Sequence, residues 1–171
     1  VTNKFISSFN LEYSLISSQI EFKDNLVFFL SNIENLNNVL MDFSKDIWLY
    51  ISKDYLKQKI SSNEVGSSTM PHKVNPIDFE NAEGNLTLSS NLISAIKNKM
   101  QISRLQRDLS DSTVSRNIGL CFAYLEISLN SLNKGLNKLE PNKSKINKEL
   151  SESWEVLAEA CLLYTSPSPR D

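Results

Sequence analysis

The sequence contains few of the residues that interrupt helices. Glycine occurs four times and proline five times in 171 residues, whereas average usage would give about 12 glycines and 9 prolines. Because these two residues weaken a helix interior more than any others, their scarcity excludes a fold built from many tight turns. The composition therefore predicts long helices.

Cysteine and histidine are also rare. The two cysteines, Cys121 and Cys161, and the single histidine, His72, cannot supply a disulfide framework or a zinc site of the usual kind. We therefore expect a reducing, cytoplasmic setting.

The sequence has neither a long apolar run nor an excess of positive charge. Its longest apolar stretches, residues 26–30 and 120–125, are far shorter than the roughly 18 residues that a membrane span needs. Lysine and arginine number 18 against 20 acidic residues, so the formal net charge is -2. We therefore expect neither a membrane nor a nucleic acid as a partner.

Apolar and small residues recur at alternating steps of three and four along three segments, which is the period of a helix with one buried face. The first series is Leu26, Phe29, Ile33, Leu36, Leu40, Phe43, Ile47 and Tyr50. The second is Phe79, Ala82, Leu86, Ser89, Ile93, Ile96 and Met100, and the third is Val114, Ile118, Cys121, Leu125, Ser128, Leu132, Gly135 and Leu139. The three series predict an all-α fold, a bundle of long helices that cross at about 20°. No segment has the alternation of a strand.

The third series ends at Pro141, because proline cannot continue a helix. A shorter amphipathic segment follows, with Ile146, Leu150, Trp154 and Leu157. We expect residues 1–140 to be part of a central helical-bundle domain, residues 141–161 to begin a C-terminal helical domain, and residues 162–171 to be a disordered or foreign tail. The chain starts at Val1 without a methionine, which is typical of an internal piece of a longer protein.

The longest break between the helical segments is residues 61–76, SSNEVGSSTMPHKVNP. A connection longer than about 12 residues is uncommon between helices unless it has a function or is disordered. It ends with Asn75 and Pro76, an N-cap residue and a first-turn proline, which predict a helix N-terminus that favours an anion. A polar, solvent-exposed connection explains the composition of this loop about equally well.

Arginine is concentrated in one short region. Outside the tail, the only arginines are Arg104, Arg107 and Arg116, in a chain that has many more lysines. Where lysine is the general surface cation, clustered guanidinium groups favour bidentate recognition of a carboxylate or phosphate. The alternative is an ordinary helix start, capped by Ser110 or Ser112.

The remaining reactive or large side chains receive simpler interpretations. His72 lies beside Lys73, and a neighbouring cation disfavours a protonated histidine, so we interpret it as a surface residue or a donor to substrate rather than as a general acid. Cys121 lies in the third apolar series and is interpreted as a small buried residue. Trp48 and Trp154 are interpreted as packing residues.

The loop carries a family resemblance. Residues 66–76, GSSTMPHKVNP, resemble the signature loop of the fumarase and aspartase superfamily, G-S-S-x-M-P-x-K-x-N-P, at every fixed position. The continuation IDFENAEGNL and the stretch SRLQRDLSDSTVSRN, residues 103–117, are similar to the bacterial type of the adenylosuccinate lyase family. The similarity extends from near the start of the chain to WEVLAEA, residues 154–160, and stops before the Ser-Pro tail.

This resemblance implies a lyase of purine biosynthesis. The reaction would be β-elimination of fumarate from adenylosuccinate, giving AMP, and from the succinylocarboxamide ribotide. The family implies a homotetramer built on long helices, with each active site shared between three subunits, and no metal or organic cofactor. Two alternatives stay open: argininosuccinate lyase or another fumarate-releasing lyase, and a non-catalytic helical oligomerisation module.

The resemblance also assigns roles to individual residues. Ser67 would be the general base, Lys73 would stabilise charge, and Glu80 would orient a catalytic histidine that is expected upstream, so that the isolated chain is expected to be inactive. The residues implied to bind substrate are Gln19, Ser68, Lys73, Val74, Asn75, Asn81, Arg107, Ser112, Thr113, Val114, Ser115 and Arg116.

Overall fold

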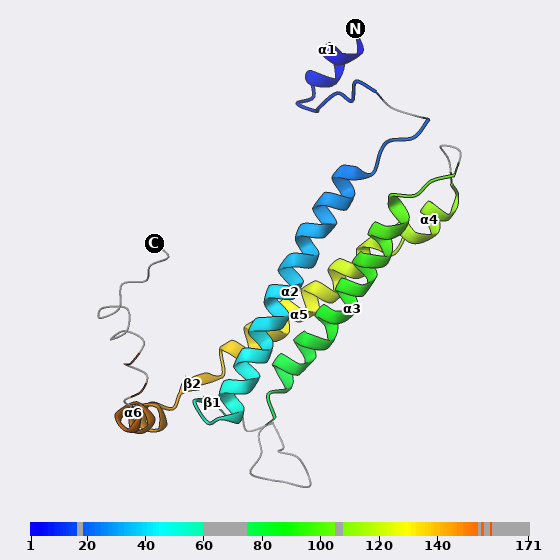
Figure 1. The fold of residues 1–171 in the computed structure, drawn as a ribbon. Coiled ribbons are helices and arrows are strands. Elements are labelled where there is room, and N and C mark those ends of the chain that lie inside the picture. The colour runs from blue at the N-terminus through cyan, green and yellow to red at the C-terminus, as the bar shows by residue number, and fades with distance from the viewer. Residues whose placement is uncertain (17–18, 60–74, 105–107, 154, 156–157, 159–171) are drawn as a thin grey trace. The chain divides into compact units, whose positions relative to one another are not determined.

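The computed structural model describes residues 1–16, 19–59, 75–104, 108–153, 155 and 158. In chain order, these residues form α1 (Thr2–Ser7), α2 (Asp24–Ser52), β1 (Leu56–Gln58), α3 (Ile77–Met100), α4 (Ser110–Ser115), α5 (Ile118–Leu136), β2 (Leu139–Pro141) and α6 (Lys143–Glu152) (Figure 1). Helices dominate the described residues, so the all-α expectation is confirmed. The expectation that no strand forms is wrong for two segments of three residues each.

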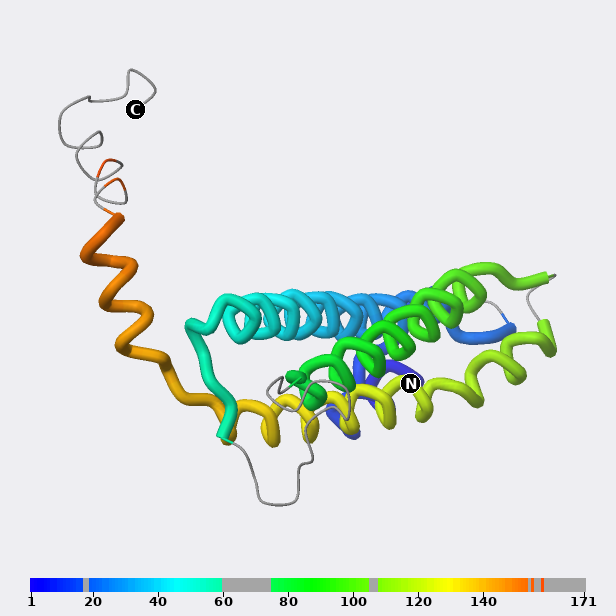
Figure 2. The backbone as a smooth tube through the Cα atoms, turned by 90° about the horizontal axis from the view of Figure 1, so that it is seen from below, coloured from blue at the N-terminus to red at the C-terminus, as the bar shows by residue number. Residues whose placement is uncertain are grey.

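The chain divides into two compact units, and the first comprises Val1–Asp42 and Glu83–Leu129. In this unit, parts of α2, α3 and α5 lie side by side in both backbone views (Figure 1; Figure 2). The core cluster consists of Val27, Leu30, Ile93, Ile96, Met100 and Cys121. All three helices therefore contribute to one apolar core, and the stabilisation comes from the apolar surface that they remove from water.

The second and third apolar series are confirmed. Every residue of the second series is buried, from Phe79 to Met100. In the third series, Cys121, Leu125, Ser128, Leu132 and Gly135 are buried, and the others are half-buried. Cys121 is 1% exposed, as its position predicts, and burial raises the pKa of its thiol.

The first apolar series is only partly correct. Phe29, Leu36, Phe43 and Tyr50 are exposed, whereas Val27, Leu30, Asn37, Ser44 and Ile47 are buried. Asn37 can occupy the core because its Nδ2 donates to Ser89 Oγ at 2.9 Å, and Ser89 Oγ in turn donates to the Cys121 carbonyl at 2.9 Å. A pattern that counts apolar residues cannot find a helix face whose buried positions are partly polar.

The second unit comprises Phe43–Ala82 and Asn130–Asp171. Its two strands pair antiparallel, with Leu56 opposite Pro141, Lys57 opposite Glu140 and Gln58 opposite Leu139. The ion pair between Lys59 Nζ and Glu140 Oε1, at 3.0 Å, extends this contact by one residue. Each strand is too short to show a period of two, and its partner lies more than eighty positions away, so local pattern does not predict it.

The turn after α2 is fixed by its own backbone and by Asn142. Asp54 has a φ of 61°, and the amide of Tyr55 donates to the Tyr50 carbonyl at 2.9 Å, which together form a left-handed helix cap. The buried Asn142 donates from Nδ2 to both the carbonyl and Oδ2 of Asp54, at 2.9 Å each. Its Oδ1 accepts from the amide of Lys145 and caps α6. One side chain thus joins the end of α2 to the start of α6.

The third series does not form one continuous helix. It is split between α4 and α5, and α5 ends at Leu136, before Pro141 is reached. Residues 139–141 form β2 instead. Among the described residues, no helix is both long and apolar enough to cross a membrane.

Candidate functional site

Several predicted site residues lie outside the described residues. These are Ser67, Ser68, Lys73 and Val74, with His72, in the segment 60–74, and Arg107 in the segment 105–107. The predicted residues that the structure describes fall in the two units separately. Asn75, Glu80 and Asn81 belong to the second unit, whereas Gln19 and residues 112–116 belong to the first.

The N-terminal end of α3 places Glu80 and Asn81 on the solvent side. The helix begins at Ile77, so Pro76 rather than Asn75 immediately precedes it, and the Pro76 carbonyl accepts from the amides of Phe79 and Glu80 at 3.0 and 3.1 Å. Phe79 is 1% exposed and anchors this turn in the core, while Glu80 and Asn81 are exposed. The carboxylates of the first turn suit the positive end of a helix dipole.

Asp78 adds a second anchor from α5. Its Oδ1 is 3.2 Å from Lys134 Nζ, and its Oδ2 accepts from Lys138 Nζ at 2.8 Å. Asp78 and Lys138 are largely buried at the side chain, so this pair is stronger than an ordinary surface pair. The turn that carries Glu80 and Asn81 is therefore fixed on two sides, by Phe79 and by Asp78.

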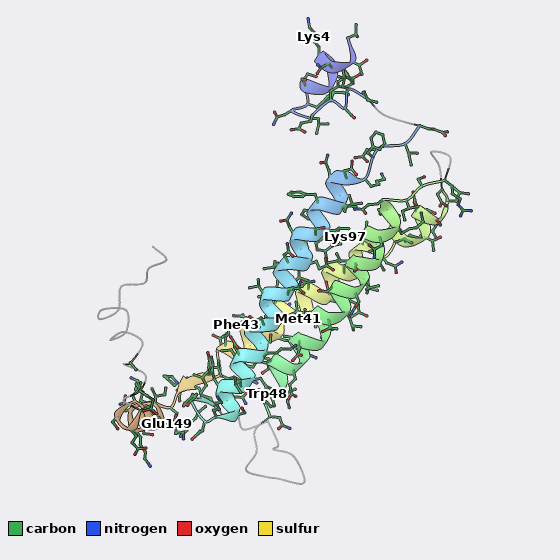
Figure 3. All side chains as sticks on the ribbon, viewed as in Figure 1. Lys4, Met41, Phe43, Trp48, Lys97 and Glu149 are labelled. Atoms are coloured by element: carbon green, nitrogen blue, oxygen red, sulfur yellow. The ribbon has the colours of Figure 1, made fainter. Side chains whose placement is uncertain are left out.

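Trp48 contacts Glu80 directly. The indole Nε1 donates to Glu80 Oε1 at 3.0 Å. Trp48 is 43% exposed, so the interpretation of this residue as packing is wrong. Figure 3 shows Trp48 near the C-terminal end of α2. The pairing joins residues 32 positions apart on two helices, and no local sequence signal predicts it.

A pocket of about 550 Å³ opens beside this contact. Its walls are Trp48, Ile51, Ser52, Asp54, Leu56, Lys57, Gln58, Asn75, Pro76 and Glu80. The lining residues come from both sides of the segment 60–74 in sequence, with Lys57 and Gln58 before it and Asn75 and Pro76 after it. A cavity of this size with one indole, two carboxylates, an ammonium and two amides can hold a small polar ligand.

Asn81 faces α5. Its Oδ1 accepts from Ser131 Oγ at 2.8 Å. This contact fixes the orientation of the amide, because the oxygen is the atom that meets a hydroxyl donor.

Helix α4 carries four predicted substrate-binding residues, 112–115, and a fifth, Arg116, is its C-cap. Ser112, Thr113 and Arg116 are exposed, while Val114 is half-buried and packs against the core of the first unit. Ser112 Oγ donates to the Leu109 carbonyl at 2.8 Å. The exposed side of the helix and its C-cap thus present two hydroxyl groups and a guanidinium.

The start of α4 is capped differently from the expectation. Neither Ser110 nor Ser112 is the N-cap, which is Leu109, without a side-chain cap bond. Asp108 supplies the acceptor instead, since its Oδ1 accepts from the amide and the hydroxyl of Ser110 at 3.0 and 2.8 Å. These hydrogen bonds, with those from Lys99 and Arg104, hold the pKa of Asp108 well below its usual range.

Gln19 lines a separate concavity of about 650 Å³ in the first unit. The other lining residues are Ile6, Glu12, Tyr13, Ser14, Ile20, Glu21, Phe22, Asp24 and Asn25. The described residues that line this concavity include three carboxylates and no cation, so on its own it does not suit an anionic ligand.

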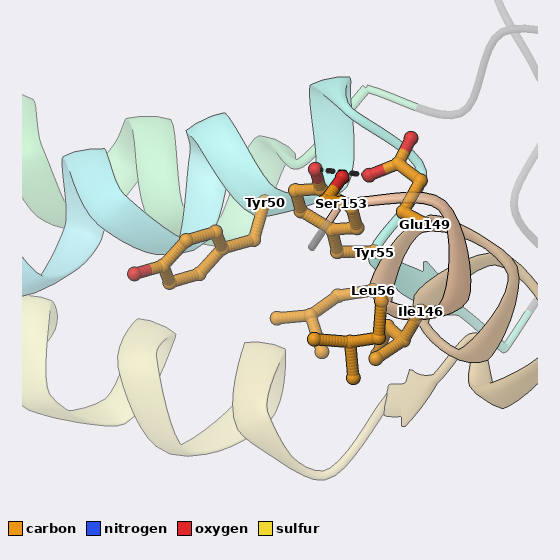
Figure 4. Close-up of a pocket in the computed structure, with 7 residues that line it drawn as sticks. Tyr50, Tyr55, Leu56, Ile146, Glu149 and Ser153 are labelled. Carbon is orange, nitrogen blue, oxygen red and sulfur yellow. Dashed lines mark hydrogen bonds between the residues drawn. The ribbon is translucent and has the colours of Figure 1, made fainter. Parts of the chain in front are cut away.

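A third pocket contains no predicted site residue. It measures about 430 Å³ and is lined by Tyr50, Tyr55, Leu56, Ile146, Glu149, Leu150 and Ser153 (Figure 4). Tyr55 Oη donates to Glu149 Oε2 at 2.5 Å, and this hydrogen bond raises the pKa of the phenol.

Within the part of the chain that the structure describes, no group of three or more histidine, cysteine, aspartate or glutamate side chains could hold a metal ion.

Comparison with known families matches most of the chain. Residues 4–89 match a family described as "Lyase", and residues 103–165 match one described as "Adenylosuccinate lyase C-terminal". The first match includes residues 61–76, and the second includes α4 and α5.

Curated relatives give the same result over most of this chain. The chain is 54% identical to an adenylosuccinate lyase of Legionella pneumophila over 156 residues, which are 91% of this chain and 34% of the relative. It is 51% identical to that of Buchnera aphidicola subsp. Schizaphis graminum over 94% of the chain, and 45% identical to that of Escherichia coli over 92%. The chain spans about a third of the length of these relatives. It belongs to the lyase family, and the three relatives named here are adenylosuccinate lyases.

Proposed function

We propose that the chain is a segment of a lyase that eliminates fumarate from adenylosuccinate to give AMP. The same enzyme would act on the succinylocarboxamide ribotide of purine biosynthesis. One observation carries the proposal: 54% identity to an adenylosuccinate lyase extends over 91% of the chain. An identity this high over both units favours the same substrate class and not only the same fold.

The chemistry requires a base, a place for negative charge and an acid. Ser67 would remove a proton from the succinyl methylene carbon, which is next to the carbon that carries the nitrogen, and the electron pair would be held as an aci-carboxylate. The C–N bond then breaks, the electron pair forms the double bond of fumarate, and the departing nitrogen takes a proton from a histidine outside this chain. A serine hydroxyl is too weak an acid to ionise at neutral pH without nearby positive charge, and Lys73 is the candidate cation.

The remaining residues divide between the two parts of the substrate. Ser68, Lys73, Asn75 and the backbone of Val74 would bind the succinyl carboxylates, and Glu80 would orient the catalytic histidine. The nucleotide would be held by Gln19, Asn81, Arg107, Ser112, Thr113, Val114, Ser115 and Arg116. The pocket that joins Asn75 and Glu80 supports the first group. The exposed hydroxyls and guanidinium of α4 support the second.

The family also suggests an assembly. We propose a homotetramer whose active sites are shared between subunits and which works in the cytoplasm. Residues 1–140 would belong to the central bundle domain and residues 141–161 to the start of a C-terminal helical domain, followed by a tail at 162–171. An argininosuccinate lyase would share the loop but has no use for a phosphate site, and the names of the relatives favour the purine substrate. A non-catalytic module would not need Lys73, Asn75 and the arginine cluster together.

The test is a Ser67→Ala substitution in the full-length lyase. We expect release of AMP and fumarate from adenylosuccinate by the wild type, and no measurable turnover by the variant. AMP affinity should stay within about tenfold, because a base acts in the transition state rather than in binding. Ser68→Ala is the matched control, since it removes a hydroxyl from the adjacent position and should weaken binding more than it lowers kcat. Wild-type turnover of argininosuccinate but not of adenylosuccinate would refute the substrate assignment.

A further inference from the structure

Lys99 lies at the centre of a polar cluster between the end of α3 and the start of α4, in the first unit. Its Nζ is 2.6 Å from Asp111 Oδ1, 3.3 Å from Asp108 Oδ2 and 2.8 Å from the Ile102 carbonyl. The side chains of Lys99, Asp108 and Asp111 are 25%, 9% and 19% exposed. Partial burial makes these contacts stronger than ordinary surface ion pairs.

The three contacts account for the hydrogen-bonding capacity of the ammonium group. A lysine ammonium has three N–H donors and no acceptor, and three oxygen atoms surround this one. The hydrogen bond to Asp111 is the main cause that raises the pKa of Lys99, so the group keeps its charge at neutral pH. Lys99 is therefore occupied by the protein itself and is not available to a ligand.

Asp108 extends the cluster into α4. While its Oδ2 faces Lys99 and Arg104 Nε, each at 3.3 Å, its Oδ1 accepts from the amide and hydroxyl of Ser110. Asp111 follows Ser110 and lies in the first turn of α4. The two carboxylates thus tie the first turn of α4 to the last turn of α3.

Helix α4 needs such support. It has six residues, far fewer than the roughly 12 to 15 at which an isolated helix becomes marginally stable. Its other anchor is Val114, which packs against the core cluster of the first unit. Val114 is fixed by the core and Asp111 by Lys99. Ser112, Thr113 and Arg116 are therefore exposed in one fixed arrangement.

We infer that Lys99, acting through Asp108 and Asp111, is the positioning residue for the nucleotide-binding residues of α4. This inference rests on the proposed function, because it takes the ligand of α4 to be the anionic purine nucleotide. Lys99 does not touch that ligand. It determines where the hydroxyls of Ser112 and Thr113 and the guanidinium of Arg116 stand.

The chain supplies a matched control in Lys97. It lies two residues earlier on α3, and its Nζ is also engaged, with Glu34 and with Ser31 Oγ at 3.2 Å. These partners lie on α2, not on α4. Lys99→Met and Lys97→Met remove the same charge from the same helix, and only the first releases α4.

The experiment compares these two variants with the wild type in the full-length lyase. For Lys99→Met we expect faster hydrogen exchange at the amides of residues 110–116, an increase of about tenfold in the Kd of AMP and a similar increase in KM for adenylosuccinate, with kcat changed less than about threefold. Lys97→Met should change none of these beyond its effect on global stability. If Lys99→Met does not fold, Asp111→Asn replaces it. Asparagine has nearly the same volume as aspartate, and the ion pair between Lys99 and Asp108 is kept.

Each result decides the inference. Unchanged exchange at residues 110–116 in Lys99→Met overturns it, whatever the protein binds. Faster exchange with wild-type AMP affinity also overturns it, since α4 would then move without consequence for the ligand. Equal loss of AMP affinity in Lys97→Met assigns the effect to general destabilisation and overturns it too. A wild type that neither binds AMP nor cleaves adenylosuccinate refutes the proposed function instead, and the exchange data still decide whether Lys99 positions α4.

Discussion

Of the three predicted catalytic residues, Glu80 is the one within the described part of the chain, and its carboxylate already has a donor. Trp48 Nε1 donates to Oε1 at 3.0 Å. A carboxylate that must orient a histidine needs a fixed rotamer, and a hydrogen bond to one oxygen fixes it while the other oxygen stays available. Trp48 would therefore act through Glu80 rather than on the substrate.

A Trp48→Phe substitution tests this relation. Phenylalanine keeps an aromatic ring in the pocket wall but removes the N–H donor, so kcat for adenylosuccinate should fall by up to about tenfold with little change in KM. The free energy of unfolding should change by less than about 1 kcal/mol, because both partners are exposed. The decisive measurement is a double-mutant cycle with Glu80→Ala, which removes the acceptor of the Trp48 N–H. An equal loss from Trp48→Phe in the Glu80→Ala background would show that Trp48 does not work through Glu80.

A second prediction at the scale of single residues concerns Arg116. If its guanidinium binds the 5′-phosphate, Arg116→Lys should raise the Kd of AMP by roughly 10- to 100-fold, since lysine keeps the charge but loses the planar pair of donors. Fumarate has no phosphate, so its affinity should change less. Arg104→Lys is the control, because Arg104 is 82% exposed and pairs only with Asp108 among the contacts found for it. Titration of AMP and fumarate by calorimetry measures both, and wild-type AMP affinity in Arg116→Lys would place the phosphate elsewhere.

At the scale of helices, the contact between α3 and α5 in the second unit depends on a glycine. A Cβ atom added at Gly135 would lie 2.8 Å from both Cε2 and Cζ of Phe79, whose side chain is 1% exposed. The ring has little room to move, so the absence of a side chain at Gly135 is what lets the helices approach. Gly84 lies on α3 and Gly119 on α5, and neither has any such neighbour within 4 Å.

The glycines therefore predict opposite effects of the same substitution. Gly135→Ala should lower the free energy of unfolding by about 1 kcal/mol or more, because overpacking at Phe79 exceeds the gain in helix propensity. Gly84→Ala should raise it by about 0.5 to 1 kcal/mol, because only the propensity gain applies. Urea denaturation of the 171-residue chain measures both. A stabilised Gly135→Ala variant would mean that Phe79 can move aside.

The helices also show what sequence pattern can and cannot predict. The second series, Phe79 to Met100, is correct because every position that faces the core is apolar or small. The α2 face is shifted because Asn37 and Ser44 occupy core positions, and their suitability depends on partners such as Ser89 on another helix. The strands depend on pairing across the sequence, and the break between α4 and α5 contains no proline; its local signal is Asn117, a residue type favoured at N-caps, immediately before α5.

The site was predictable to the extent that one local motif contains it. Residues 66–76 match the superfamily pattern without any structure, whereas the Trp48–Glu80 contact joins two helices and has no local signal. The Lys99 cluster has a weak local signal in the sequence, because acidic residues at 108 and 111 follow a lysine at the end of the preceding helix. Charge pairs of this kind are common on surfaces, so only their burial distinguishes this cluster.

At the scale of the whole molecule, α2 leaves a partly exposed apolar stripe. Phe29, Leu36, Phe43 and Tyr50 recur every seven residues and are 51%, 44%, 36% and 43% exposed. This spacing is that of one seam of a coiled coil, which is buried when another helix packs along it. An exposed stripe of this length is unusual for a monomer, and it agrees with the homotetramer that we propose.

Substitution within this stripe tests the assembly. Leu36→Glu places a charge in the middle of the proposed helix contact, where burial without a partner is unfavourable, so the full-length lyase should dissociate from tetramers to smaller species in sedimentation velocity. Because the active sites are proposed to be shared between subunits, turnover of adenylosuccinate should fall together with the tetramer fraction and recover at high protein concentration. Asn38→Glu is the control, since it adds the same charge to the same helix at an exposed polar position outside the stripe. Tetramers that persist in Leu36→Glu, or dissociation that occurs equally in Asn38→Glu, would show that the stripe is not the contact that holds the subunits together.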